Sequence, residues 1–430
     1  MEDIRLGAIL LEGGVVDEAG LERCLAIQAL TGGARPLGQI LIEQGLLDAA
    51  RLQRLLDLQR RRVAARGACV PATDVGSTAL LQAAIANQAS EIVVSEGRPV
   101  RMRVSCEWRD LTSEVLRGPE VWDFVRETMG GEVLEALAEQ HFVVRTWRRD
   151  GLGQGSATAF RQFDGVAARV TFTAAEASSP EAAQLPPSVA EIVRGGKGLL
   201  LVVGERGAGR SEALAPIVKL AAAEANHYVV VLDDEPMPLP TEGALVVRRR
   251  FGLSPQARAN SLRSVVREDP DTLVIADVGS PETFEIGLRA AEGGRLVVAY
   301  MDSSTAAAAL TRALNFYPTY DLPRIRSTLA AVLRAVLVRQ VLPDVEHTGT
   351  VAATELLVVD DAVREVIRGG DMADLGLLIR AEGSRCGHSL DRNMLELLVA
   401  GRVRMEDVFA RAEEKAWLLE RTRDLQTTAR

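Results

Sequence analysis

Apolar residues fall into two patterns along this chain, and each pattern predicts one kind of element. Largely apolar runs at 198–203 and at 272–277, the second ending in the carboxylate of Asp277, are typical of strands that are buried on both faces. Stretches with apolar side chains three and four positions apart, as at 189–194, predict helices. From residue 185 onward strands and helices alternate, which predicts a mainly parallel sheet with helices on its faces.

The pattern is different between residues 74 and 184, where strands outnumber helices. Helices are expected at 78–87 and 121–140, and the stretch 89–104 predicts a β-hairpin that turns at Gly97-Arg-Pro. Three further strands are expected at 142–147, 156–161 and 167–172. The segment is therefore predicted to be a separate α+β domain.

The first sixty residues contain a tandem repeat. Residues 5–14 (Arg-Leu-Gly-Ala-Ile-Leu-Leu-Glu-Gly-Gly) recur as 36–45 (Pro-Leu-Gly-Gln-Ile-Leu-Ile-Glu-Gln-Gly), an offset of 31 positions. The same offset relates Gln28 to Gln59. Each unit predicts a short apolar helix, a glycine turn and a second helix, so two units can bury their leucine faces against each other.

A glycine-rich loop, Gly204-Glu-Arg-Gly-Ala-Gly-Arg-Ser211, joins the strand at 198–203 to a predicted helix at 212–219. A P-loop has a glycine, four free positions, a second glycine, a lysine and then serine or threonine. Here Arg210 stands at the lysine position. The loop is expected to cradle nucleotide phosphates at the helix N-terminus; the alternative is a plain turn between strand and helix. The candidate nucleotide-binding residues are Gly204, Gly207, Ala208, Gly209, Arg210, Ser211 and Glu212, with the Ser211 hydroxyl as the candidate Mg²⁺ ligand.

Composition and charge argue against several classes of protein. The chain has 430 residues and a net charge of −9, whereas a general nucleic-acid binder carries a basic footprint. Its four cysteines form no Cys-x-x-Cys pair, so no structural zinc site is expected. No apolar run approaches the roughly 20 residues that span a bilayer, and the first residues lack the features of a secretory signal. The protein is expected in the cytoplasm, with access to the inner membrane only through partners.

Several phrases in the second half resemble type II and type IV secretion ATPases. Residues 261–271 (Ser-Leu-Arg-Ser-Val-Val-Arg-Glu-Asp-Pro-Asp) are similar to the phrase before that family's Walker B strand, and 362–368 resembles a phrase of the retraction ATPases. The absence of the family's cysteine cluster favours this retraction (PilT-like) branch. The resemblance implies an α/β fold with a RecA-like P-loop core at 185–370, a helical region at 371–430, and hexameric rings.

The two N-terminal segments resemble family domains as well. The phrase at 89–99 is similar to the PAS-like domain of the retraction ATPases, which implies a PAS-like α+β domain at 74–184 after a linker at 61–73. The repeat at 1–60 resembles the MshEN domain of pilus-extension and type II secretion ATPases, which in some members binds cyclic di-GMP. The alternative is a purely structural helical module. By this resemblance the cyclic di-GMP contacts would be Arg5, Leu6, Gly7, Gly14, Gln28, Arg35, Leu37, Gly38, Gly45 and Gln59.

The acidic positions of the family are altered in this chain. Asp277 aligns with the Walker B glutamate and is one methylene shorter, and 233–236 (Asp-Asp-Glu-Pro) represents the acidic box. Asp277 and Asp234 are therefore the candidate catalytic residues. The alternative interpretation is that these acids merely end strands at a solvated sheet edge.

Other catalytic positions have lost their expected residue types. Arg295 and Asp302 stand where the family has histidines. Gln154 and Ser156 occupy positions where it has arginines that reach a neighbouring subunit's nucleotide. Because each missing donor costs about 10²–10³ in rate, little hydrolysis is expected.

The sequence therefore favours a homologue of the pilus and secretion ATPases that binds ATP with Mg²⁺, hydrolyses it poorly, and regulates or caps a motor. Its expected partners are related ATPases, in a homo- or hetero-hexamer, and the inner-membrane platform protein of a pilus or secretion machine. Two alternatives stay open. One is an active hexameric ATPase that drives pilus retraction, and the other is a cyclic di-GMP receptor that uses the motor fold as a scaffold.

Overall fold

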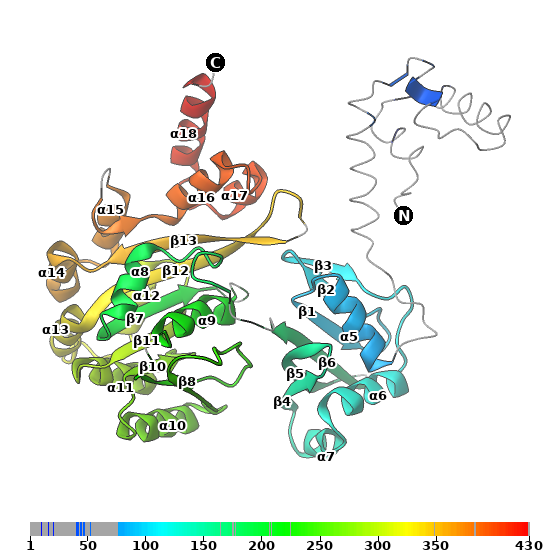
Figure 1. Ribbon diagram of the computed structural model, residues 1–430, viewed down its shortest axis with the longest axis horizontal. Coiled ribbons are helices and arrows are strands. Elements are labelled where there is room, and N and C mark those ends of the chain that lie inside the picture. The colour runs from blue at the N-terminus through cyan, green and yellow to red at the C-terminus, as the bar shows by residue number, and fades with distance from the viewer. Residues whose placement is uncertain are drawn as a thin grey trace.

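The computed structural model of the protein describes residues 76–428 except positions 164, 174, 175, 177, 206, 208, 224, 348, 382 and 383, together with isolated positions between residues 10 and 52. The tandem-repeat domain at 1–60 and the linker at 61–73 thus lie almost wholly outside the described residues, and both stay predictions. The described part contains two β-sheets, each accompanied by helices (Figure 1).

The first sheet is antiparallel throughout. The helices and strands of this part of the chain are α5 (Ser77–Ala86), β1 (Glu91–Ser95), β2 (Arg101–Val104), β3 (Glu107–Asp110), α6 (Gly118–Met129), α7 (Glu132–Glu139), β4 (Phe142–Arg149), β5 (Gly153–Gln162) and β6 (Gly165–Thr173). The strand order is β3-β2-β1-β6-β5-β4. The predicted hairpin is confirmed, because β1 pairs antiparallel with β2. Apolar side chains of the sheet and its helices, such as Leu81, Ile92 and Phe124, share one buried core.

The stretch predicted to be helical at 121–140 is helical in the structure, but as two helices with a break between them. Gly130 ends α6 with a φ angle of 94°, a conformation that glycine adopts readily and that a helix does not contain. The chain then starts again as α7 from Gly131. The two adjacent glycines therefore turn one expected element into two.

The second sheet confirms the predicted mainly parallel arrangement. Its strands are β7 (Gly198–Gly204), β8 (Tyr228–Leu232), β9 (Leu245–Arg249), β10 (Thr272–Ile275), β11 (Leu296–Asp302), β12 (Leu333–Pro343), β13 (Thr350–Val358) and β14 (Gly387–His388). In the described residues their order is β14-β13-β12-β7-β11-β10-β8-β9. All neighbours from β12 to β9 are parallel, whereas β13 and β14 add antiparallel pairs at one edge. β14 lies within the segment 371–430 that was expected to be helical.

Helices cover both faces of this sheet (Figure 1). The helices of this part of the chain are α8 (Pro187–Arg194), α9 (Arg210–Ala221), α10 (Pro255–Arg267), α11 (Pro281–Glu292), α12 (Ala306–Leu314), α13 (Leu322–Val332), α14 (Asp361–Gly369), α15 (Ala373–Arg380), α16 (Leu390–Val399), α17 (Met405–Arg411) and α18 (Lys415–Thr428), and those from α8 to α15 line the two faces. Alternate side chains of β7 point to opposite faces, as strand geometry requires. Leu199 and Leu201 join the core under α10 to α15, whereas Leu200 and Val202 pack against α8 and α9. Burial on both faces explains why this strand is apolar at every position.

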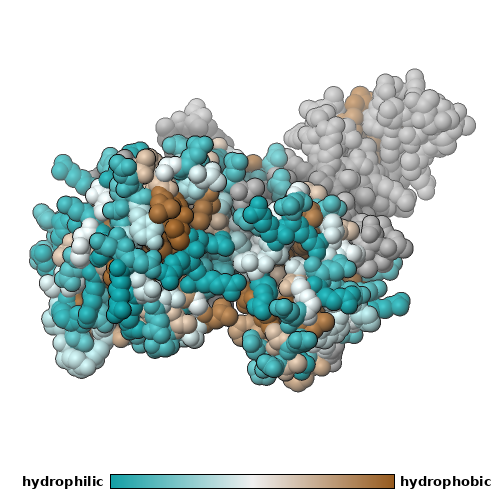
Figure 2. Space-filling model, turned by 60° about the horizontal axis from the view of Figure 1, so that its bottom comes forward, coloured by the Kyte–Doolittle hydropathy of each residue, from teal (hydrophilic) through white to brown (hydrophobic). Residues whose placement is uncertain are grey.

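The C-terminal helices form a smaller core of their own against β12 and β13. Leu397 of α16, Val408 of α17 and Leu418 of α18 pack there with Leu342 and Val351. Of the helices that the structure describes, none is both long enough and apolar enough to cross a bilayer. Figure 2 shows one face of the molecule, where the described surface is mostly hydrophilic and carries scattered hydrophobic patches.

Candidate nucleotide-binding site

The glycine-rich loop runs from the end of β7 to the start of α9, at the edge where the parallel strands end. β7 ends at Gly204. Gly207 and Gly209 have φ angles of 89° and 72°, which glycine adopts without the strain that a side chain brings. A methyl group on Gly209 would also lie 2.6 Å from Nη1 of Arg339. The loop therefore requires its glycines. Ala208 lies outside the described residues.

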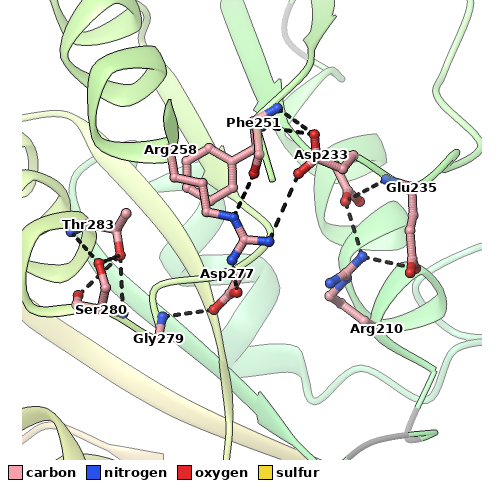
Figure 3. Close-up of polar contacts among 11 residues, drawn as sticks. Arg210, Asp233, Glu235, Phe251, Arg258, Asp277, Gly279, Ser280 and Thr283 are labelled. Carbon is pink, nitrogen blue, oxygen red and sulfur yellow. Dashed lines mark hydrogen bonds and ion pairs between the residues drawn. The ribbon is translucent and has the colours of Figure 1, made fainter. Parts of the chain in front are cut away.

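Arg210, at the lysine position of the P-loop pattern, is held by two acids (Figure 3). Its Nη2 atom donates to Oδ1 of Asp233 at 3.1 Å and lies 2.9 Å from Oε2 of Glu235. Asp233 directly follows β8, and only 2% of its side chain is exposed. Its Oδ1 also accepts from the backbone N–H of Glu235 at 3.1 Å, whereas its Oδ2 has no hydrogen-bond partner among the described residues.

The charges at this pair are set by burial and by each other. Burial raises the pKa of Asp233 to about 6, although Arg210 and the Glu235 N–H act in the opposite direction. Burial alone would lower the pKa of Arg210, but the charges of Asp233 and Glu235 more than offset it, so the net pKa is raised. Asp277 contributes to the same rise, so it too lies near Arg210. Arg210 therefore stays charged, while Asp233 titrates close to the physiological range.

Asp277, the Walker B-like acid, is paired with an arginine of α10. Its Oδ2 forms an ion pair with Arg258, and its Oδ1 accepts from the N–H of Gly279 at 2.7 Å (Figure 3). Arg258 is fixed from two other sides. Its Nε donates to the carbonyl of Gly252 at 2.8 Å, and its guanidinium lies 5.4 Å from the ring centroid of Phe251.

Asp234, the other candidate catalytic acid, faces the same arginine. Its Oδ2 lies 4.0 Å from Nη2 of Arg258. Its Oδ1 accepts from the backbone N–H groups of Phe251 and Gly252, at 3.1 and 2.9 Å. The structure thus brings both candidate acids together around one guanidinium. They are not simply solvated ends of strands.

The remaining acids near the loop have different surroundings. Glu212, in the first turn of α9, has its Oε2 atom 3.1 Å from Nη2 of Arg339. Nη1 of Arg339 donates to the carbonyl of Gly209 at 3.4 Å, so Arg339 joins β12 to the loop. Asp302 ends β11 in register with Gly204 and is exposed, so this altered histidine position lies beside the loop.

The other altered positions lie elsewhere. Arg295 precedes β11 at the end away from the loop and forms an ion pair with Asp269. Gln154 and Ser156 lie on β5 of the first sheet, where the N–H of Ser156 donates to Oγ1 of Thr171 at 3.3 Å. The predicted cyclic di-GMP contacts, Arg5, Leu6, Gly7, Gly14, Gln28, Arg35, Leu37, Gly38, Gly45 and Gln59, lie outside the described residues.

Three arginines of this site were missed at the level of sequence: Arg258, Arg339 and Arg103. Arg103 of β2 comes from the first sheet, and its Nη1 would lie 3.6 Å from a methyl group on Gly207. The same atom is 3.2 Å from Oε1 of the buried Glu91. No pattern in the sequence marks these side chains, because each reaches the site from a different element.

The P-loop resemblance implies a nucleotide and Mg²⁺, and the residues fit these two ligands differently. The glycines and the N-terminus of α9 offer backbone N–H groups and a positive dipole, which fit a phosphate. The Ser211 hydroxyl, in the first turn of α9, suits either ligand. Asp234 and Asp277 do not fit a metal ion, because Arg258 faces both of them and their other oxygens accept backbone N–H groups. Asp233 is paired with Arg210 through Oδ1. Within the described residues no group of three or more His, Cys, Asp or Glu side chains is arranged to hold a metal.

Comparison with known proteins places the fold. The chain is 24% identical over 335 residues to the type IV pilus ATPase PilU of Pseudomonas aeruginosa, which covers 78% of this chain and 88% of that protein. It is 26% identical over 341 residues to the pilus retraction ATPase PilT of the same organism, covering 79% and 97%. The crystal structure of the pilus retraction motor PilT with bound ADP superposes with a TM-score of 0.64 at 25% identity, covering 77% of this chain and 95% of that one.

These likenesses support the α/β fold with a RecA-like core, while the PAS-like and MshEN-like assignments stay predictions. Membership of a family of ATPases implies nucleotide and Mg²⁺ as ligands. The family model described as type II/IV secretion system protein matches residues 152–429, more than half of the chain. The chain therefore belongs to the type II/IV secretion system protein family.

Proposed function

We propose that this chain binds a nucleotide in its glycine-rich loop, hydrolyses it poorly, and regulates or caps a pilus or secretion motor. The observation that carries the proposal is the pairing of the acids at the site with arginines of the same chain. Arg210 is bound to Asp233 and Glu235, and Arg258 is bound to Asp277. The groups that would handle phosphates and water in a motor are thus occupied with one another.

Nucleotide binding is supported by the backbone of the loop. Gly207 and Gly209 hold the left-handed conformations that bring N–H groups toward an anion, and α9 adds its N-terminal dipole. The matched PilT structure contains ADP and covers most of this chain. These features do not depend on a lysine.

Poor hydrolysis is supported by the number of altered groups. Phosphoryl transfer needs a cation on the β- and γ-phosphates, a carboxylate for metal or water, and further cations around the transferred group. Arg210 is diverted, Asp277 is shortened and paired, and Ser156 is a buried serine at a position where the family has an arginine. Because single donors are worth about 10²–10³ in rate, the combined loss leaves little turnover.

The partners follow from the family. We propose a homo- or hetero-hexamer with related ATPases, at the inner-membrane platform protein of a pilus or secretion machine. A subunit that binds nucleotide without hydrolysing it can occupy one place in a ring and slow it. Nucleic acid is not among the proposed partners.

ATP binding and ATP turnover measured on the same purified sample test the proposal. We expect saturable heat in calorimetry with ATP, and phosphate release at the background of the assay. Turnover comparable to that of a pilus motor, lost in Asp277→Ala and kept in Asp361→Ala, would contradict the proposal and favour the active retraction ATPase. Asp361 suits as the control because its side chain is fully exposed at the start of α14.

A further inference from the structure

The acids that follow β8 and β10 already have a cation between them. Arg258 forms an ion pair with Asp277, and its Nη2 lies 4.0 Å from Oδ2 of Asp234 (Figure 3). The exposed fractions of the three side chains are 30%, 34% and 20% in that order. Since the group is partly buried, its charges are screened less than those of surface pairs. Arg258 is also held in place by the carbonyl of Gly252 and the Phe251 ring.

The oxygens of these acids have little capacity left for a metal ion. Oδ1 of Asp277 accepts from the N–H of Gly279, and Oδ1 of Asp234 accepts from two backbone N–H groups. Their Oδ2 atoms face the guanidinium of Arg258. Mg²⁺ requires oxygen ligands at about 2.0–2.1 Å in near-ideal octahedral geometry. A guanidinium that already contacts the same carboxylate both occupies that position and repels a second cation.

A second resident cation lies at the loop itself. Arg210 begins α9, directly after the glycines, and its guanidinium bridges Asp233 and Glu235. Its charge is permanent and needs no metal, and a phosphate that binds here shares the Nη2 donors with the two carboxylates. The positive end of α9 and the N–H groups of the loop act in the same direction on a phosphate.

We infer that this site binds a nucleoside di- or triphosphate without Mg²⁺, with Arg210 and Arg258 supplying the positive charge that family membership would assign to the metal. Ser211 then contacts phosphate directly through its hydroxyl. The inference rests on the nucleotide binding proposed above. It adds that the bound ligand is the free nucleotide anion and not its Mg²⁺ complex.

Calorimetry of the full chain with ATP, once in excess MgCl₂ and once in excess EDTA, tests this inference. We expect the two dissociation constants to differ by less than about threefold. Saturable binding in MgCl₂ that weakens by about tenfold or more in EDTA overturns the inference while leaving the proposed function in place. Absence of binding in both buffers overturns the proposed function, and the inference with it.

Substitution of Arg258 tests whether its charge is what allows ATP to bind without Mg²⁺. Arg258→Met keeps an unbranched apolar side chain but removes the guanidinium and its charge, so we expect ATP affinity in EDTA to fall by about tenfold and affinity in MgCl₂ to change less. Arg263→Met is the matched control, since Arg263 is exposed on the same helix and donates to Oδ1 of Asn260 at 3.0 Å. Arg258→Gln serves as a second variant, and thermal unfolding verifies that each variant is folded. Unchanged affinity in EDTA for both Arg258 variants would overturn the inference.

Discussion

Arginine at position 210 replaces a compact ammonium group by a planar guanidinium that presents several donors at once. In this protein the Nη2 atom of that group contacts both Asp233 and Glu235. A phosphate must therefore compete with two carboxylates for the same N–H groups. Arg210 keeps the positive charge of the P-loop lysine but loses much of its availability.

If hydrolysis is poor, as proposed above, it should rise only when several of these groups are changed together, because groups that act as a unit are not additive. Arg210→Lys alone leaves Asp277 on Arg258, and Arg258→Leu alone leaves Arg210 on Asp233. We expect each single change to alter ATP turnover by less than about threefold, and the triple variant that adds Asp277→Glu to raise it about 10²-fold. Phosphate release at saturating ATP measures the turnover of the single variants and of the triple variant.

The matched control for the triple variant is Arg289→Lys, because Arg289 is an exposed arginine of α11 that pairs with Glu285. It should leave turnover unchanged. If the triple variant binds ATP as the parent does and still releases no phosphate, the pairs described here are not what limits hydrolysis.

We expect Asp233 to make nucleotide affinity depend on pH. Its pKa is raised to about 6 by burial, so the carboxylate is charged at pH 7.5 and binds Arg210, and becomes neutral as the pH falls through that value. Protonation removes a negative charge beside the phosphates and releases one contact of Arg210. We expect ATP to bind about fivefold more tightly at pH 5.5 than at pH 7.5. Calorimetry across this range measures the change.

The control for this pH dependence is Asp233→Asn, which is neutral at every pH and so reports the titration of the ATP phosphates alone. The parent protein should show the steeper dependence. Equal slopes for the two proteins would mean that Asp233 does not regulate the site.

The order of elements around the loop could be predicted from the hydrophobic pattern. β7 is buried at every position, so its run of apolar residues ends where the strand meets the loop at Gly204. The alternation of strands and helices predicted a mainly parallel sheet, which is confirmed. The stretch expected to be helical at 121–140 is divided into two helices because Gly130 and Gly131 interrupt it.

The arginines at the site could not be predicted in this way. Arg258 is 19 positions from Asp277 in the sequence, and the two meet only because α10 packs beside the ends of β8 and β10. The helical pattern of α10 identifies its buried side, with Leu262 and Val265, but not which arginine reaches an acid on a neighbouring strand. Such pairs depend on the placement of two elements, and a pattern within one element contains no information about it.

The conformation of the loop itself gives a prediction at Gly209. Its φ of 72° and the short distances from an added methyl group to Arg339 and Glu212 make alanine unfavourable there. We expect Gly209→Ala to lower the free energy of unfolding by about 1–3 kcal/mol and to weaken ATP binding. Urea unfolding and calorimetry measure these effects.

Gly131→Ala is the comparison for this substitution, because Gly131 is helical in φ and ψ and an added methyl group meets no atom within 4 Å. It should leave stability equal or slightly higher. If Gly209→Ala were as stable as Gly131→Ala, the loop would not need glycine at position 209.

The two sheets meet close to the loop, which relates nucleotide binding to the arrangement of the whole molecule. Arg103 of the first sheet approaches Gly207, and Oγ1 of Thr173 donates to the carbonyl of Pro236, the last residue of the acidic box, at 3.2 Å. A bound nucleotide would therefore lie near residues of both sheets. We expect binding alone to bias how the two parts are held. This fits the regulatory role proposed above and needs no hydrolysis.

The tandem repeat at the N-terminus adds a second nucleotide hypothesis, which concerns a different part of the chain. Arginine can stack on guanine and pair with phosphate, and Arg5 opens the first repeat unit. If the repeat is a cyclic di-GMP receptor, calorimetry with cyclic di-GMP shows saturable heat, and Arg5→Ala weakens it about tenfold or more while leaving ATP affinity unchanged. Arg51→Ala, outside the repeated phrases, should change neither affinity. Absence of heat, or heat that Arg5→Ala leaves unchanged, would contradict the cyclic di-GMP hypothesis. The repeat would then be a structural module without the ligand that Arg5 was expected to bind.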